Sequence, residues 1–142
     1  MSLLLRPTSR LLLVAPALAV MTLQAASQER ERSQIPDEYK WNLADVYPSD
    51  EAWRAAVQTI KTDVPSLKQF EGKLGTSAAT LADALDALYG LDKELSRVYV
   101  YAAMLSDQDT RDSAHLAMQQ EMAQLAAEFS AQAAYVEPEI LR

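Results

Sequence analysis

The fold is decided by residues 81–105, which read LADALDALYGLDKELSRVYVYAAML. Apolar residues recur in this stretch at steps of three or four, the spacing that places side chains on one face of an α-helix. The set comprises Leu81, Leu85, Leu88, Leu91, Leu95, Val98, Ala102 and Leu105. Gly90 lies inside the stretch, but the apolar spacing keeps its phase on both sides, so we expect one long helix with a weak point there.

A second apolar stripe begins after a short acidic segment, residues 106–112. Its members are again spaced as on one helix face: Met118, Met122, Leu125, Phe129 and Ala133. A short connection between two long helices places them side by side and antiparallel. The sequence therefore predicts a helical hairpin, whose apolar faces need further neighbours from the rest of the chain.

Residues 50–74 supply the first of these neighbours, an additional helix before the hairpin. Ser49 is a good N-cap, and Asp50 and Glu51 follow where the helix dipole favours negative charge. Pro65 lacks an amide hydrogen and predicts a kink or restart, while Gly72 marks the end of the helix. The inner face is expected to contain Trp53, Val57, Ile60, Val64 and Leu67, closed by Phe70 or Leu74.

Two further punctuation signals complete this all-α prediction. Thr76 or Ser77 should cap the long helix that follows Gly75. Residues 41–48, WNLADVYP, contain two aromatic and two large aliphatic residues without helical spacing, and Pro48 disfavours helix at the residue before it. We expect this segment to lie across the helices as an ordered strap.

Composition limits the possible partners. The chain has 142 residues, a net charge of −7 and a pI of about 4.6. This charge excludes nucleic acid and anionic membranes as expected partners, because both attract positive charge. With 49% apolar residues and three glycines, the sequence is that of a folding chain. The absence of cysteine excludes disulfides and a lipid-modified signal peptide.

Residues 1–26 have the pattern of a secretory signal peptide. Arg6 and Arg10 precede an apolar run over residues 11–23, and small residues follow at positions 25–27. An uncleaved anchor is the alternative, but this run of 13 residues contains Pro16, whereas a membrane-spanning helix needs about 20 residues. Cleavage would leave 11 basic and 20 acidic residues, a net charge of −9. We therefore expect an exported, periplasmic or extracellular protein without a stable membrane anchor.

The remaining chain divides into an extended leader, residues 27–40, and a helical lobe, residues 41–142. Its last segment, residues 136–142, reads VEPEILR and has the proline expected near the start of another helix. A five-residue helix has no stability of its own. On this ground we expect the chain to be the amino-terminal part of a longer protein.

Candidate chemical groups are few. His115 is the single histidine, and a zinc site normally takes three or four His, Cys or carboxylate ligands, so we expect a solvated or partly packed side chain.

Asp107, Asp109 and Asp112 suggest a calcium loop, but Arg111 stands where the loop needs an oxygen ligand and Asp112 where it needs glycine. The alternative, which we prefer, is that Asp109 caps a helix beginning at residue 110.

Nucleophilic and cofactor chemistry is equally unsupported by the sequence. It contains no Gly-x-Ser-x-Gly motif, no cysteine and no glycine-rich phosphate loop. Tyr99, Tyr101 and Met104 are interpreted as groove-filling residues, and the carboxylates as the solvated faces of helices. The sequence thus predicts no catalytic, cofactor-binding or metal-binding residue.

Five short motifs occur in an order that resembles the amino-terminal region of the oligoendopeptidase F family. The motifs are Trp41-Asn42-Leu43 with Asp45, Tyr47-Pro48-Ser49-Asp50-Glu51-Ala52-Trp53, Gly72-Lys73-Leu74, Tyr101-Ala102 with Asp107 and Asp109, and Pro138-Glu139-Ile140-Leu141. The resemblance implies a mostly helical zinc metallopeptidase of the thimet-oligopeptidase type that cuts short peptides in a deep channel. It also implies that residues 41–142 are the lobe that covers this channel.

The same resemblance places the catalytic zinc elsewhere. The family holds zinc with a His-Glu-x-x-His helix and a further glutamate, but His115 is followed by Leu116 and no His-Glu pair occurs here. Zinc is therefore expected in a catalytic domain outside this chain, with that domain and short peptides as partners, and the chain alone is expected to be inactive. Two alternatives remain open: a small exported helical adaptor or chaperone-like module that binds a partner helix, and a self-associating bundle.

Overall fold

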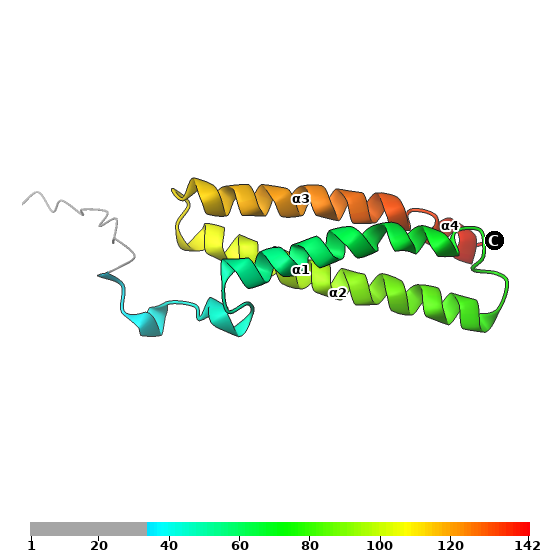
Figure 1. Ribbon diagram of the computed structural model, residues 1–142, viewed down its shortest axis with the longest axis horizontal. Coiled ribbons are helices and arrows are strands. Elements are labelled where there is room, and N and C mark those ends of the chain that lie inside the picture. The colour runs from blue at the N-terminus through cyan, green and yellow to red at the C-terminus, as the bar shows by residue number, and fades with distance from the viewer. Residues whose placement is uncertain (1–33) are drawn as a thin grey trace, which may run out of the picture.

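The computed structural model describes residues 34–142, which form helices joined by short connections (Figure 1). No strand occurs in this range, so the all-α prediction is confirmed. The predicted signal peptide, residues 1–26, and half of the predicted leader, residues 27–33, lie outside the described residues. In chain order the elements are η2 (Asp37–Tyr39), η3 (Leu43–Asp45), α1 (Asp50–Asp63), η4 (Val64–Phe70), α2 (Ala78–Gln108), α3 (Ser113–Ala133) and α4 (Val136–Ile140).

Helix α1 begins where the capping residues predict. The Ser49 hydroxyl accepts a hydrogen bond from the Ala52 amide at 3.2 Å. The α-helix ends at Asp63, and the chain continues as the 3-10 helix η4 with Pro65 in its first turn. Pro65 cannot donate to a carbonyl one turn back, which accounts for the predicted restart. Val64 and Leu67 nevertheless remain on the buried side.

The long helix α2 runs without interruption through Gly90, as predicted. Ser77 caps it, because its hydroxyl accepts from the Thr80 amide at 3.0 Å. With 31 residues and a rise of about 1.5 Å per residue, α2 is about 46 Å long. Helix α3 returns alongside it in the opposite direction, which confirms the hairpin (Figure 1).

The predicted cap of α3 is wrong by three residues. The helix begins at Ser113 and not at residue 110, and the carboxylate of Asp112 accepts from the Ala114 amide at 2.8 Å. The Asp109 carboxylate binds the amide and guanidinium of Arg111 instead. Asp109 is thus occupied within the turn, and Asp112 is left to satisfy the free amides of the helix.

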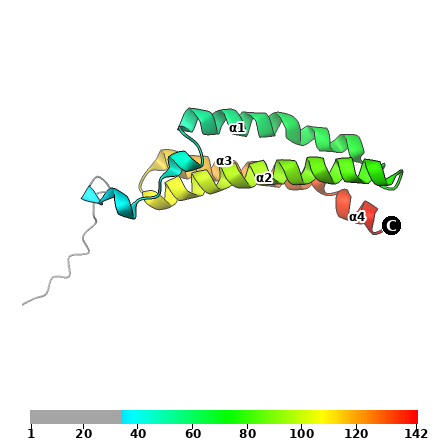
Figure 2. The same ribbon diagram turned by 90° about the horizontal axis from the view of Figure 1, so that it is seen from below.

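Helix α1 packs on one side of the α2–α3 pair, and Figure 2 shows no other helix of the described chain lying along the opposite side. The core between the three helices contains Trp53, Val57, Ile60, Val64, Leu95, Val98, Tyr101, Ala102, Met118, Met122 and Leu125. The predicted inner face of α1 and η4 is therefore confirmed, and that of α3 is confirmed at Met118, Met122 and Leu125, whereas Phe129 and Ala133 are only partly buried. On α2 the predicted stripe is buried at Leu95, Val98 and Ala102, whereas its other members are only partly buried: Leu81, Leu85, Leu88, Leu91 and Leu105.

The predicted strap is ordered, but only part of it is inserted. Leu43 and Tyr47 are buried against the helices, whereas Trp41 is 54% exposed. Upstream, where an extended leader was expected, Asp37–Tyr39 forms a 3-10 turn closed by a 2.9 Å ion pair between Lys40 and Asp37. Within residues 34–142 no helix is long and apolar enough to span a bilayer.

Candidate functional site

The described part of the chain contains no group of three or more His, Cys, Asp or Glu side chains placed to hold a metal ion. His115 lies in the first turn of α3, half-buried, with its Nδ1 3.5 Å from a carboxylate oxygen of Asp112. Hydrogen bonds from the side chain and the backbone amide of Arg111 lower the pKa of Asp109. These groups lie in the turn between α2 and α3, where Asp112, and not the predicted Asp109, caps the following helix.

The most densely connected polar cluster joins the strap, α1 and α2. The indole N–H of Trp53 donates to the backbone carbonyl of Val98 at 2.9 Å, in a fully buried position. The Tyr101 hydroxyl donates to the Asp50 carboxylate at 2.9 Å, and the Tyr101 ring packs edge-on against Tyr47 with 5.5 Å between centroids. Buried Trp and Tyr side chains require such partners for their polar atoms.

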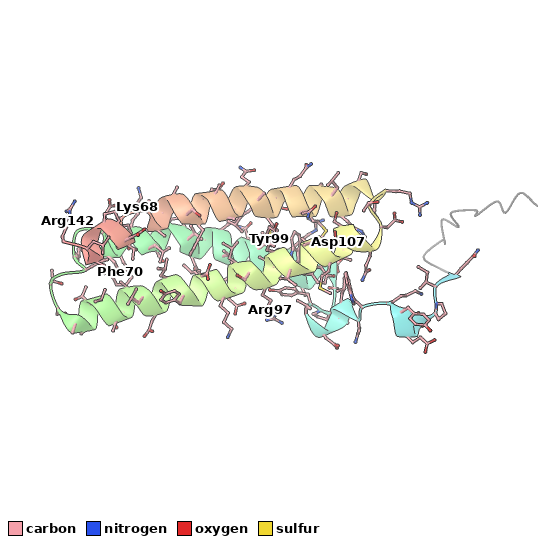
Figure 3. All side chains as sticks on the ribbon, turned by 180° about the vertical axis from the view of Figure 1, so that it is seen from behind. Lys68, Phe70, Arg97, Tyr99, Asp107 and Arg142 are labelled. Atoms are coloured by element: carbon pink, nitrogen blue, oxygen red, sulfur yellow. The ribbon has the colours of Figure 1, made fainter. Side chains whose placement is uncertain are left out.

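Arg97 holds the strap from the other side. Its guanidinium donates to the Val46 carbonyl at 2.6 Å and lies 4.6 Å above the Tyr47 ring centroid. This combines a charge-assisted hydrogen bond with a cation–π contact. Figure 3 shows Arg97 on the edge of α2 that faces the strap. The sequence does not predict this role for Arg97. Its only indication is that Arg97 directly precedes the buried Val98 and so lies beside the core face of α2.

The electrostatic environment raises the pKa of both tyrosines in this cluster. Burial is the larger cause for each, because a phenolate is poorly solvated away from water. The hydrogen bond to Asp50 adds to the effect at Tyr101 and raises its pKa to about 12. The Arg97 charge partly offsets the effect at Tyr47. Both hydroxyls are therefore neutral at physiological pH and suit structural roles.

A second polar contact fixes the short helix α4. The two carboxylate oxygens of Glu139 accept hydrogen bonds from the amides of Gly72 and Leu74, in the turn between η4 and α2. The Tyr135 hydroxyl donates to the Leu67 carbonyl at 2.6 Å. Gly72 has a φ of +76°, a conformation that glycine adopts without strain. Helix α4 is therefore held by tertiary contacts despite its length of five residues.

The side of the α2–α3 hairpin opposite α1 carries two apolar depressions, which together we call the α2–α3 groove; Figure 3 views the chain from this side, with Tyr99 labelled. One depression has a volume of about 350 Å³. It is lined by Leu85, Leu88, Tyr89, Ala133, Val136, Glu137, Ile140 and Leu141. The other has a volume of about 260 Å³. It is lined by Asp92, Leu95, Ser96, Tyr99, Val100 and Ala126.

Comparison with known proteins assigns the chain to a family. It is 39% identical over 116 residues to the oligopeptidase PepF of Bacillus subtilis (strain 168), which covers 82% of this chain. The group B oligopeptidase PepB of Streptococcus agalactiae serotype III (strain NEM316) is 34% identical over 78% of the chain. The plasmid-encoded oligoendopeptidase F of Lactococcus lactis subsp. cremoris is 30% identical over 80%. The chain corresponds to the N-terminal region of oligoendopeptidase F.

The match is confined to a minor part of these relatives. The chain covers 17%, 18% and 19% of the three proteins, respectively. No model of a protein family matches the chain, and no solved structure matches it. Most of the length of each oligoendopeptidase F relative therefore lies outside the part compared here.

The structure brings together residues from four of the motifs that resemble oligoendopeptidase F. Tyr47 and Trp53 come from one motif and Tyr101 from another, and the three side chains form one aromatic cluster. Gly72 and Glu139 come from two others and are joined by a hydrogen bond across 67 residues. The motifs thus mark contacts between elements of this helical unit.

Proposed function

We propose that the chain is the non-catalytic N-terminal lobe of an exported zinc oligoendopeptidase, and that the lobe covers the channel in which the enzyme hydrolyses short peptides. Three observations support this proposal. The curated relatives are oligopeptidases, the described residues offer no set of metal ligands, and the apolar α2–α3 groove is uncovered. The match to the oligopeptidases carries the proposal, because it covers about four fifths of this chain and less than a fifth of each relative.

Peptidase assays on the purified 142-residue chain test the catalytic half of this proposal. With added zinc and a quenched-fluorescence peptide of about eight residues, we expect no cleavage, and elemental analysis after dialysis should find much less than one zinc per chain. Bacillus subtilis PepF, assayed in parallel, checks that the peptide is a usable substrate. Hydrolysis by the chain that a chelator abolishes would contradict the proposal.

Export is tested separately with residues 1–33 fused to a reporter enzyme that becomes active only outside the cytoplasm. The fusion should be active, because the apolar run is flanked by Arg6 and Arg10 on one side and small residues on the other. Replacing Val14 with Asp should abolish the activity by interrupting the run. Equal activity of the two fusions would exclude a signal peptide of this kind.

The second candidate function is a helical adaptor that binds a partner helix, which the open α2–α3 groove also favours. The reading frame downstream of the Arg142 codon distinguishes the two. Continuation into a His-Glu-x-x-His segment supports the peptidase lobe. A stop codon at that point, together with a monodisperse and cooperatively melting product, supports the adaptor.

A further inference from the structure

We infer that the α2–α3 groove is the docking site for an apolar helix with basic residues along its border, supplied by the remaining part of the oligoendopeptidase. This inference rests on the proposed function and names the surface through which the lobe is attached. The two depressions are aligned along α2, small side chains line one wall, and the charged residues that line them are acidic.

The two depressions lie in line along the hairpin. Leu85, Tyr89, Asp92, Ser96 and Tyr99 line them on α2 at steps of three or four residues and therefore share one side of that helix. Residues 85–99 span about 21 Å at 1.5 Å per residue, which matches about four turns of a second helix. One continuous surface therefore runs from the middle of α2 to α4.

Small side chains form the opposite wall of the groove. Ala126 and Ala133 line it from α3, and their seven-residue spacing again places both on one side. Helices whose contact residues are small can approach to the lower end of the usual 8–10 Å range between axes. Tyr89 and Tyr99 border the other wall and are 65% and 43% exposed. An incoming helix would cover these rings, in the way the other helices of the chain already cover one another.

Charge distinguishes between the possible occupants. Asp92 and Glu137 are the charged residues that line the two depressions, and both are acidic. A second copy of this chain would bring the same carboxylates to the interface and a net charge of −7 with them. Like charges brought together at an interface oppose association. A basic border on the partner would pair with both carboxylates, so the complementary partner is a different, basic helix.

The comparisons provide a source for such a helix. The matched region accounts for 17–19% of the relatives compared above, so the rest of an oligoendopeptidase offers several times this chain's length. Covering the half-exposed Leu85 and Leu88 would complete the burial of the apolar stripe that the sequence of α2 predicts. The groove thus fits a helix from that part of the enzyme.

Two labelled synthetic helices test this inference with the full 142-residue chain. Both have 18 residues and the same leucine stripe; one has lysines along the border of the stripe and the other has glutamates. Fluorescence anisotropy at 150 mM salt should show binding of the lysine peptide at least tenfold tighter than binding of the glutamate peptide. Asp92→Lys should reduce this preference at least threefold.

A matched pair of variants separates docking in the groove from general attraction to an acidic protein. Tyr99→Arg should weaken the lysine peptide at least tenfold, because it places a long charged side chain in the groove. Tyr39→Arg makes the same change at a residue that is 75% exposed and distant from the groove, and should weaken it less than threefold. Circular dichroism should show both variants as helical as the original chain.

Two results would overturn the inference. One is equal weakening by Tyr99→Arg and Tyr39→Arg, or equal binding of the two peptides. The other is a concentration-dependent dimer that Tyr99→Arg dissociates, which would make a second copy the occupant. Neither result bears on catalysis, which the peptidase assay measures independently, so failure of the inference and failure of the proposed function are distinguishable.

Discussion

The carboxylate of Glu139 accepts a hydrogen bond from the backbone amide of Gly72, which lies 67 residues earlier in the chain. Its second oxygen receives the amide of Leu74 at 3.4 Å. A hydrogen bond to a charged group typically contributes about 1.5–3 kcal/mol, and less where the donor is exposed to solvent, as the Gly72 amide is. This contact fixes α4 against the turn that separates α1 and η4 from α2.

Replacing Glu139 with Gln should therefore loosen α4 and the turn without unfolding the bundle. We expect a loss of about 1–2 kcal/mol in local stability, because a neutral amide oxygen can accept only one of the two hydrogen bonds well. Hydrogen exchange should accelerate about 5- to 30-fold at the Gly72 and Leu74 amides. Glu137→Gln, two residues away and on the groove side, is the control and should leave these amides unchanged.

Gly72→Ala tests the left-handed turn itself. Its φ of +76° is unfavourable for any residue with a Cβ atom, so we expect a loss of about 1–2 kcal/mol in the free energy of unfolding. Gly75→Ala is the matched control, because Gly75 does not have a positive φ and has open space around it. Urea denaturation should find Gly75→Ala neutral or slightly stabilising. Equal losses for the two variants would contradict the role assigned to Gly72.

Two valines on the same helix test the assignment of the core face. Val98 is fully buried, whereas Val100 is 46% exposed. Val98→Asp should cost more than about 2 kcal/mol, because it buries a carboxylate without a partner. Val100→Asp introduces the same charge at the surface and should stay within about 0.5 kcal/mol. Thermal melts of the two variants should differ by many degrees, and similar melts would mean that the face is assigned wrongly.

Stability at high pH should depend on the aromatic cluster. The pKa of Tyr101 is raised to about 12 in the folded chain, so the folded state keeps the phenolic proton at a higher pH than the unfolded state does. Its contribution to stability is complete below pH 10, the pKa of an unfolded tyrosine, and falls as the pH rises from 10 to 12. Denaturation between pH 8 and 11.5 should show this decline, and Tyr101→Phe should reduce it. If the unfolding midpoint of Tyr101→Phe declined with pH as steeply as that of the original chain, the role assigned to Tyr101 would be contradicted.

The sequence predicted the parts of this fold that depend on local chemistry. Ser49, Ser77 and Pro65 act within one turn of their own positions, and the structure confirms their roles. The spacing of Val98 and Met122 likewise identified buried faces, because helical periodicity relates sequence directly to direction.

Contacts between distant residues could not be predicted in this way. Nothing in the sequence near Glu139 indicates that it binds Gly72. Asp109 and Asp112 both have a spacing suitable for an N-cap, so spacing alone does not identify Asp112 as the residue that caps α3. In the structure Arg111 binds the Asp109 carboxylate, which leaves Asp112 to cap the helix. The periodicity of α2 predicted burial of Leu85 and Leu88, but periodicity does not state which neighbour provides it. That neighbour is the subject of the docking test.

The order of contacts along the chain has a consequence for biosynthesis. Helices α1, α2 and α3 each pack against their neighbour in sequence, and such local pairing allows fast folding as a chain leaves the ribosome from its N-terminus. Glu139 is made after all three helices, yet it completes the turn after η4. The turn between η4 and α2 would therefore be secured only after the three long helices on either side of it have been synthesised.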